Sequence, residues 1–147
     1  MPDPSHAGRR YRAEGQVVEA PRAARFAAAV SAGDDVFEPG TIPPTFAAVY
    51  CLMPTLARLF ADTEVGIDLA GLVHAEQSFE WLASLHAGDV IDSEAEIASI
   101  EVRRGLIFVT VRQEATNQAG EPVCRGSSLF LIRGSGEAPA PRDEGRA

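Results

Sequence analysis

Two groups of side chains in this sequence have the types that acid–base chemistry requires. Asp34 follows Gly33 directly after an alanine-rich stretch, which would place a carboxylate in a loop at the end of a helix. His74 and Glu76 are two residues apart, so on a regular β-strand both side chains would project from the same face. Because a carboxylate can orient an imidazole for general acid–base catalysis, this pair is a candidate proton-transfer site.

Each candidate also has a purely structural interpretation, which the sequence leaves open. Aspartate suits turns and caps, so Asp34 could serve only the backbone. His74 and Glu76 could lie on a strand face that looks toward solvent or a partner. Together with His86 they offer three possible metal ligands, but the spacing matches no recognised ligand pattern, so we expect no metal. Cys51 lies in an apolar stretch, where a thiol is typical of inert packing.

A strand and a helix are predicted ahead of the loop that contains Asp34. Residues 11–18 alternate loosely between polar and apolar types and predict a short strand. The alanine-rich residues 20–32 have Pro21 near their start and a glycine directly after them, which is the usual asymmetry of a helix. Residues 33–41 then predict a loop.

The most apolar segment of the chain covers residues 46–61 and predicts a helix that is buried on nearly all sides. Pro44 suits the first turn of this helix, where no backbone amide is needed, and Pro54 should end or kink it. Because the segment contains Pro54 and Arg58 and is short, we expect a core helix rather than a membrane span.

From Leu72 onward the pattern changes to a period of two, which is typical of β-strands. The expected strands cover residues 72–82, 90–102, 106–115 and 123–133, with turns at 87–89, 103–105 and 117–120. Helices followed by a run of antiparallel strands indicate the α+β class, as a single hot-dog arrangement in which the sheet wraps around the central apolar helix. Such a sheet has an exposed edge, so we expect a dimer.

The chain has 147 residues, of which 46% are hydrophobic and 23% are charged, so its size and composition predict one folded domain. We expect a flexible arm over residues 1–9, the folded domain over 10–133 and a disordered tail over 134–147. Two cysteines are too few for a disulfide framework. The first residues lack the apolar core of a signal peptide, so we expect a cytoplasmic protein.

The formal net charge is −8, with 21 acidic residues against 13 basic ones, all of them arginine. This balance argues against binding to nucleic acids or anionic membranes. Basic residues nevertheless gather toward the end of the chain, at Arg103, Arg104, Arg112, Arg125 and Arg133. Guanidinium groups match phosphate geometry, so Arg103 and Arg104 are candidates to hold the phosphates of coenzyme A or phosphopantetheine. Solubility is the alternative explanation of these residues.

The order of these elements, with the stretches PPTF (43–46), HAEQSFEW (74–81) and AGD (87–89), resembles the MaoC-like hot-dog proteins. Within that family the sequence is similar to the FAS1-like dehydratase N-terminal domain of HadA- and HadC-type subunits. The resemblance covers residues 10–133. It implies an enzyme of fatty acid metabolism that removes water from 3-hydroxyacyl thioesters, or adds it to enoyl thioesters, carried by coenzyme A or acyl carrier protein, with no cofactor.

Active members of the family have a G-D-x-N-P-x-H loop, and the resemblance therefore implies a catalytic role for Asp34. The family's histidine is replaced by Pro39. His74 is a candidate to substitute for it. Backbone amides at the start of the central helix hold the thioester oxygen in the family. Pro43 and Pro44 lack that hydrogen, so Thr45 and Phe46 are the candidate donors.

Because the chain lacks the family's histidine, we expect the substrate-tunnel subunit of a heterodimer, with a MaoC-type chain supplying the Asp–His pair. A homodimeric hydratase with a relocated base is a second possibility. A hot-dog acyl-CoA thioesterase that uses Glu76, and a non-catalytic protein that binds acyl thioesters, are further alternatives.

Overall fold

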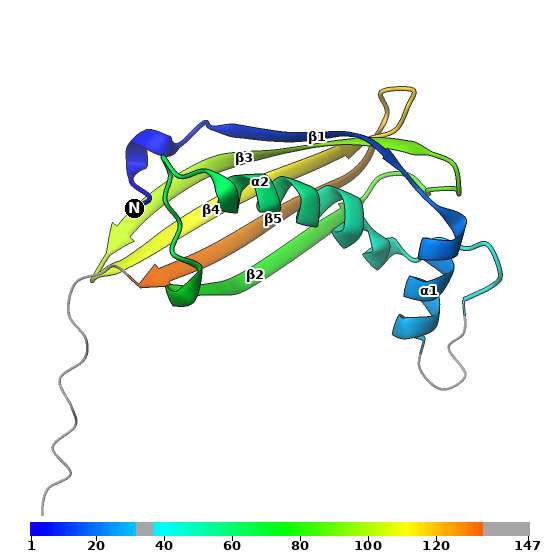
Figure 1. Ribbon diagram of the computed structural model, residues 1–147, viewed down its shortest axis with the longest axis horizontal. Helices are drawn as coiled ribbons and strands as arrows, with labels where there is room; N and C mark the ends of the chain where they lie inside the picture. The colour runs from blue at the N-terminus through cyan, green and yellow to red at the C-terminus, as the bar shows by residue number, and fades with distance from the viewer. Residues whose placement is uncertain (32–36, 134–147) are drawn as a thin grey trace, which may run out of the picture.

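The chain forms one five-stranded antiparallel sheet with a long helical segment lying across one face (Figure 1). The computed structural model describes residues 1–31 and 37–133. The strands are β1 (Arg10–Val17), β2 (Leu72–Trp81), β3 (Val90–Arg103), β4 (Leu106–Thr116) and β5 (Pro122–Arg133), in the spatial order β1-β3-β4-β5-β2. The predicted α+β class, with an antiparallel sheet around a central helix, is confirmed, and the strands end within a residue of the predicted positions.

Helix α1 (Ala20–Val30) lies beyond one end of the sheet (Figure 1). It ends earlier than predicted, because the next residue, Ser31, has an extended backbone with φ −71° and ψ 137°. Phe26 projects from α1 into the core and ties the helix to the central segment.

Residues 1–9, predicted to be a flexible arm, include a short 3-10 turn, η1 (Pro4–His6). Asp3 caps this turn, with its carboxylate accepting from the Ser5 amide at 2.8 Å. The Gly8 amide then donates to the carbonyl of Ile97 at 2.8 Å, which extends the β1–β3 pairing toward the N-terminus. The predicted tail, 134–147, lies outside the described residues.

The central helical segment changes its winding along its length. It begins as a 3-10 turn, η2 (Pro44–Phe46), widens to a π-helix, η3 (Ala48–Leu52), and continues as α2 (Met53–Ala61). Pro54 explains this change, because it has no amide hydrogen to donate to the carbonyl four residues earlier, that of Tyr50. The irregularity predicted at Pro54 thus takes the form of a π-helical turn just before this proline.

The freed carbonyl of Tyr50 is bonded by side chains from the sheet. The Ser93 hydroxyl on β3 donates to it, and the Gln16 side-chain amide on β1 donates to it at 3.0 Å. Ser93 is only 3% exposed. Because an unpaired buried carbonyl is costly, these two bonds fix the height and rotation of the helical segment on the sheet.

The apolar face of the segment packs against the inner face of the sheet, with Leu52, Leu56 and Leu59 against the aliphatic residues of β3 and β4. Pro44–Ala61 also has the length and composition to cross a membrane, with a mean hydropathy of 1.2 over 18 residues. A buried core helix has the same composition, and here the sheet covers its apolar side.

The end of the helical segment is held by Asp62. Its carboxylate accepts from the Tyr11 hydroxyl at 2.8 Å and from Arg9 at 2.9 Å, and it also accepts from the amides of Glu64 and Val65. Burial and the bond to Asp62 raise the pKa of Tyr11 to about 12. Burial raises the pKa of Asp62, but the hydrogen bonds outweigh it and lower that pKa below its usual value.

Replacing Ser93 should show how much the Tyr50 carbonyl depends on the sheet. We expect Ser93→Ala to lower the free energy of unfolding by about 1–3 kcal/mol, because it removes a donor from a buried acceptor. Ser127→Ala, on the outer face of the same sheet, is the control and should change it by less than about 0.5 kcal/mol. Equal effects in urea unfolding would contradict this role of Ser93.

Candidate functional site

The start of the helical segment places the predicted thioester-binding residues in different environments. Pro43 is buried, and its carbonyl accepts from the amide of Phe46 at 2.9 Å. The Phe46 amide is therefore used by the turn. Thr45 is exposed and has the first backbone N–H after the two prolines. Of the two predicted donors, Thr45 is the one whose position suits a thioester oxygen.

The side chain of Phe46 belongs to the core. It is 1% exposed and packs edge-on against Phe26, with ring centroids 5.2 Å apart, and against Tyr50 at 5.6 Å. These contacts join α1, η2 and η3, so the Phe46 ring fixes the start of the helical segment. Asp34, the predicted catalytic carboxylate, lies outside the described residues.

His74 and Glu76 do not share a face, and this part of the prediction is wrong. The pairing of β2 with β5 shifts by one residue between them, a β-bulge at Ala75, so that His74 lies opposite Phe130 and Glu76 opposite Leu129. The His74 ring contacts the Phe130 ring in a tilted arrangement, with 4.6 Å between centroids and 37° between planes, on the helix side of the sheet. Glu76 lies on the outer face. The bulge reverses the alternation that the sequence pattern implies.

Strand β2 is an edge of the sheet, and it is the strand that the helical segment contacts least. The main contacts of α2 are with β1 and β3, and those of η3 are with β3, β4 and β5. On β2, Phe79 is half-buried and Trp81 is 44% exposed, with their rings stacked at 5.1 Å. Val73 is 59% exposed on the same strand. This edge presents apolar side chains beside unpaired backbone groups.

Three polar side chains lie in the middle of this inner face, and the sequence analysis did not identify them. Gln113, Ser128 and Gln77 come from β4, β5 and β2, and they are joined by hydrogen bonds of 2.8 and 2.5 Å. The sequence does contain a signal for Gln113, because it interrupts an alternating apolar series at 107, 109, 111 and 115.

The predicted phosphate-binding arginines lie at the other end of the sheet from Thr45 and Phe46. Arg103 ends β3 and Arg104 begins the turn to β4, whereas Phe46 packs near Ile91 at the start of β3. The distance along β3 is roughly 40 Å at the usual rise of a strand. Figure 1 shows this separation, with α1 at one end and the β3–β4 turn at the opposite end. Arg103 also pairs with Glu101. Within one chain the two groups cannot contact one phosphopantetheine arm.

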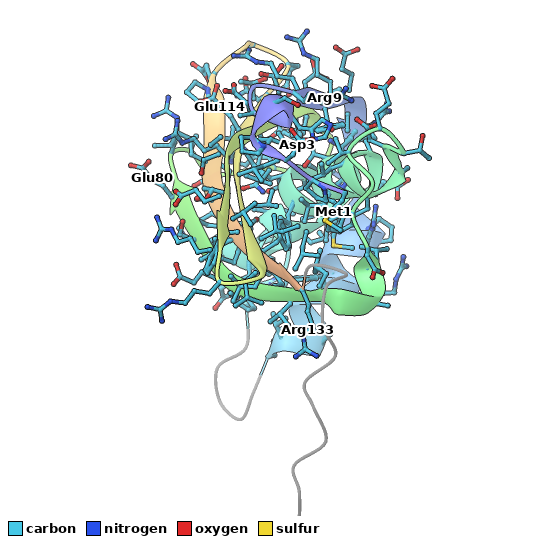
Figure 2. All side chains as sticks on the ribbon, turned by 90° about the vertical axis from the view of Figure 1, so that its left-hand side faces the viewer. Met1, Asp3, Arg9, Glu80, Glu114 and Arg133 are labelled. Carbon is cyan, nitrogen blue, oxygen red and sulfur yellow. The ribbon has the colours of Figure 1, made fainter. Side chains whose placement is uncertain are left out.

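Charged side chains surround the molecule, and Figure 2 shows labelled examples such as Arg9, Glu80, Glu114 and Arg133 projecting outward. Cys51 is fully buried, and the neighbouring Cys124 thiol and burial raise the pKa of the Cys51 thiol, which does not suit a nucleophile. Within residues 1–31 and 37–133, no group of three His, Cys, Asp or Glu side chains is placed to hold a metal ion.

The sequence comparison decides the family. Residues 5–125 match the FAS1-like dehydratase domain region. The chain belongs to the FAS1-like dehydratase family. A UPF0336 protein from Saccharopolyspora erythraea is 37% identical over 101 residues, which are 69% of this chain and 64% of that protein. This FAS1-like dehydratase chain therefore aligns with slightly less than two thirds of that relative's length.

Solved structures confirm the hot-dog fold of this FAS1-like dehydratase chain. The HadBC (3R-hydroxyacyl-ACP dehydratase) complex from Mycobacterium tuberculosis contains a chain that matches with a TM-score of 0.69 and 24% identity, covering 86% of this chain and 96% of that one. A MaoC-like dehydratase from Rhodospirillum rubrum matches with a TM-score of 0.63 and 18% identity, covering 90% and 94%. The predicted hot-dog fold is thus confirmed, and the match of residues 5–125 confirms the predicted FAS1-like dehydratase family.

The different environments of Thr45 and Phe46 at the start of the helical segment can be tested by measuring the stability of variants. We expect Phe46→Ala to lower the free energy of unfolding by about 3 kcal/mol or more, because it leaves a cavity among aromatic rings. Thr45→Ala is the matched control at an exposed position and should change it by less than about 0.5 kcal/mol. Similar values for the two variants in urea unfolding would contradict the assignment of Phe46 to the core.

Proposed function

We propose that this chain is the substrate-tunnel subunit of a (3R)-hydroxyacyl-thioester dehydratase, which in reverse is an enoyl-thioester hydratase. One observation carries the proposal: in a FAS1-like dehydratase chain, the apolar helical segment begins at the exposed residue Thr45, and it contacts β2 less than it contacts any other strand. A fatty thioester bound there would place its carbonyl at the helix start and its acyl chain along the inner face of β2.

The chemistry needs a base and an acid near that carbonyl. Loss of a proton from the carbon next to the carbonyl and of the hydroxyl from the following carbon gives a trans-2-enoyl thioester and water. The Thr45 N–H would stabilise the negative charge that develops on the thioester oxygen. Pro39 occupies the position of the family's histidine, so the base comes from elsewhere. His74 is an unsuitable replacement because it lies opposite Phe130, six residues along β5 from Cys124, which packs in the same cluster as Phe46 at the helix start.

The missing histidine points to a second hot-dog chain as partner. Strand β2 has a free edge, and the exposed Val73, Trp81 and Leu82 lie along it or just beyond it. The likeness to one chain of the HadBC complex supports a partnership of this kind. We infer that β2 pairs with the corresponding edge of a MaoC-type catalytic chain or of a second copy, in the cytoplasm, with coenzyme A or acyl carrier protein as the thioester's carrier.

The thioesterase alternative is weaker than the sequence suggested. Its candidate residue, Glu76, lies on the outer face of the sheet, on the opposite side from the helical segment. The apolar segment itself contains no acidic residue. The remaining alternative is a non-catalytic protein that binds acyl thioesters. It would use the same channel as the proposed dehydratase but would not convert its ligand.

Enzyme assays separate these functions. With the MaoC-type chain encoded beside it, the protein should lower the absorbance of enoyl-CoA, because water adds across the double bond. If the chain is active alone, Asp34→Asn should reduce the rate by a hundredfold or more while leaving folding intact. Thiol release from acyl-CoA would instead support a thioesterase. Binding without turnover in every combination would contradict the dehydratase proposal.

The partner edge can be tested with two exposed valines on opposite edges of the sheet. Val73 on β2 is 59% exposed and Val17 on β1 is 55% exposed. We expect Val73→Lys to dissociate the complex in sedimentation velocity, because it buries a charge in the interface. Val17→Lys should leave the complex intact. Dissociation by Val17→Lys alone would place the interface on β1 instead.

A further inference from the structure

Gln77, Ser128 and Gln113 form a row of hydrogen-bonded polar side chains across three neighbouring strands, named here the polar file. The other side chains of this inner face are mostly apolar. The polar file runs from Gln77, half-buried on the edge strand β2, through Ser128 on β5, to Gln113 on β4, which is only 3% exposed. Aliphatic residues of β3 and β4 lie beside it in the core. A buried polar file of this kind is expensive unless every member is fully paired.

The direction of each hydrogen bond in the file follows from its outer end. The Gln77 side-chain nitrogen donates to the carbonyl of Ser78 at 2.9 Å. The amide oxygen of Gln77 could not take this position, because it has no hydrogen to donate. Its oxygen must therefore accept from the Ser128 hydroxyl, at 2.5 Å. Ser128 has only one hydrogen, so its oxygen accepts from the Gln113 nitrogen, at 2.8 Å.

This order leaves one acceptor atom of the three side chains without a hydrogen-bond partner. The Gln113 Oε1 is buried and has no hydrogen-bond partner among the described residues. Because the order of donors fixes the amide orientation, the missing partner has to be a donor, an N–H or an O–H. A buried amide oxygen without a partner costs stability, and such groups are tolerated mainly where function requires them.

Gly126 and Phe79 define the space around this oxygen. A Cβ at position 126 would lie 3.1 Å from Gln113 Oε1 and 3.2 Å from the Phe79 ring, so glycine leaves room for the amide beside the ring. Phe79 is half-buried and stacks on the exposed Trp81, on the open inner face of β2. The free oxygen thus lies close to the Phe79 ring, which borders the proposed channel.

We propose that Gln113 Oε1 is a specificity-determining acceptor for a hydrogen-bond donor on the bound thioester. The donor is either an amide N–H of the pantetheine arm or a hydroxyl of the acyl chain, and Ser128 and Gln77 hold the Gln113 amide in the orientation that offers its oxygen. This inference rests on the proposed function, because it assumes that a thioester occupies the channel.

The test compares (3R)-3-hydroxyoctanoyl-CoA with octanoyl-CoA, by titration calorimetry, on the protein with any partner that co-purifies. The variant is Gln113→Leu, which keeps the volume and removes the acceptor. Gln118→Leu makes the same change in an exposed turn and should bind both ligands as the wild type does. We expect Gln113→Leu to weaken binding about tenfold. Loss for the hydroxyacyl ligand alone identifies the acyl hydroxyl, and equal loss for both identifies the pantetheine.

The melting temperature of the Gln113→Leu variant separates a binding role of Gln113 from a purely structural one. If Gln113 mainly stabilised the fold, the variant would melt at a lower temperature than the wild type. Gln113→Leu should melt at the wild-type temperature or above it, because it removes an unpaired buried oxygen and leaves the Gln77–Ser128 bond. A folded Gln113→Leu protein that binds both ligands like the wild type would overturn the inference while leaving the proposed function in place. If the wild type binds neither thioester, the proposed function fails, and the inference fails with it.

Discussion

The removal of the helical segment 44–61 from water is the constraint on which the other features depend. Its apolar side needs a surface of matching size, and the inner face of the sheet supplies it. Pro54 adds a second requirement, because it frees the Tyr50 carbonyl inside the protein. Ser93 and Gln16 satisfy that carbonyl from β3 and β1. Hydrophobic burial thus holds the segment on the sheet, and one polar contact fixes its position there.

That position makes the two edges of the sheet different. The end of the segment is anchored near β1 through Asp62 and Tyr11, whereas the segment makes few contacts with β2. Aromatic rings, the polar file and exposed apolar residues all lie on or beside the edge strand β2. The proposed substrate channel and the proposed partner edge both lie on this side of the sheet of a chain that belongs to the FAS1-like dehydratase family.

The sequence predicted the elements well because strand alternation and helix signals are local. The five strands, α1 and the irregular helix at Pro54 all follow from residue types within a few positions. The site was harder to predict because it depends on register. A bulge at Ala75 moved Glu76 to the outer face, and no residue type there indicates a bulge. The distance between Arg104 and Thr45 depends on which strand ends lie together.

Gln113 is an intermediate case. Its place in an apolar series was visible in the sequence, but its significance depends on Ser128 and Gln77, which only the strand pairing brings beside it. Single polar residues within an alternating apolar strand are therefore useful candidates before a structure is known. Their function can be assigned only when the partners across the sheet have been identified.

Photolabelling with an acyl-CoA that carries a diazirine on its acyl chain tests most directly whether the thioester lies between the helical segment and β2. Peptide mapping should find the label on the inner face of β2, at Phe79 or Trp81, and on the facing side of η3. A label confined to the outer face, around Phe108 or Leu131, would contradict the account.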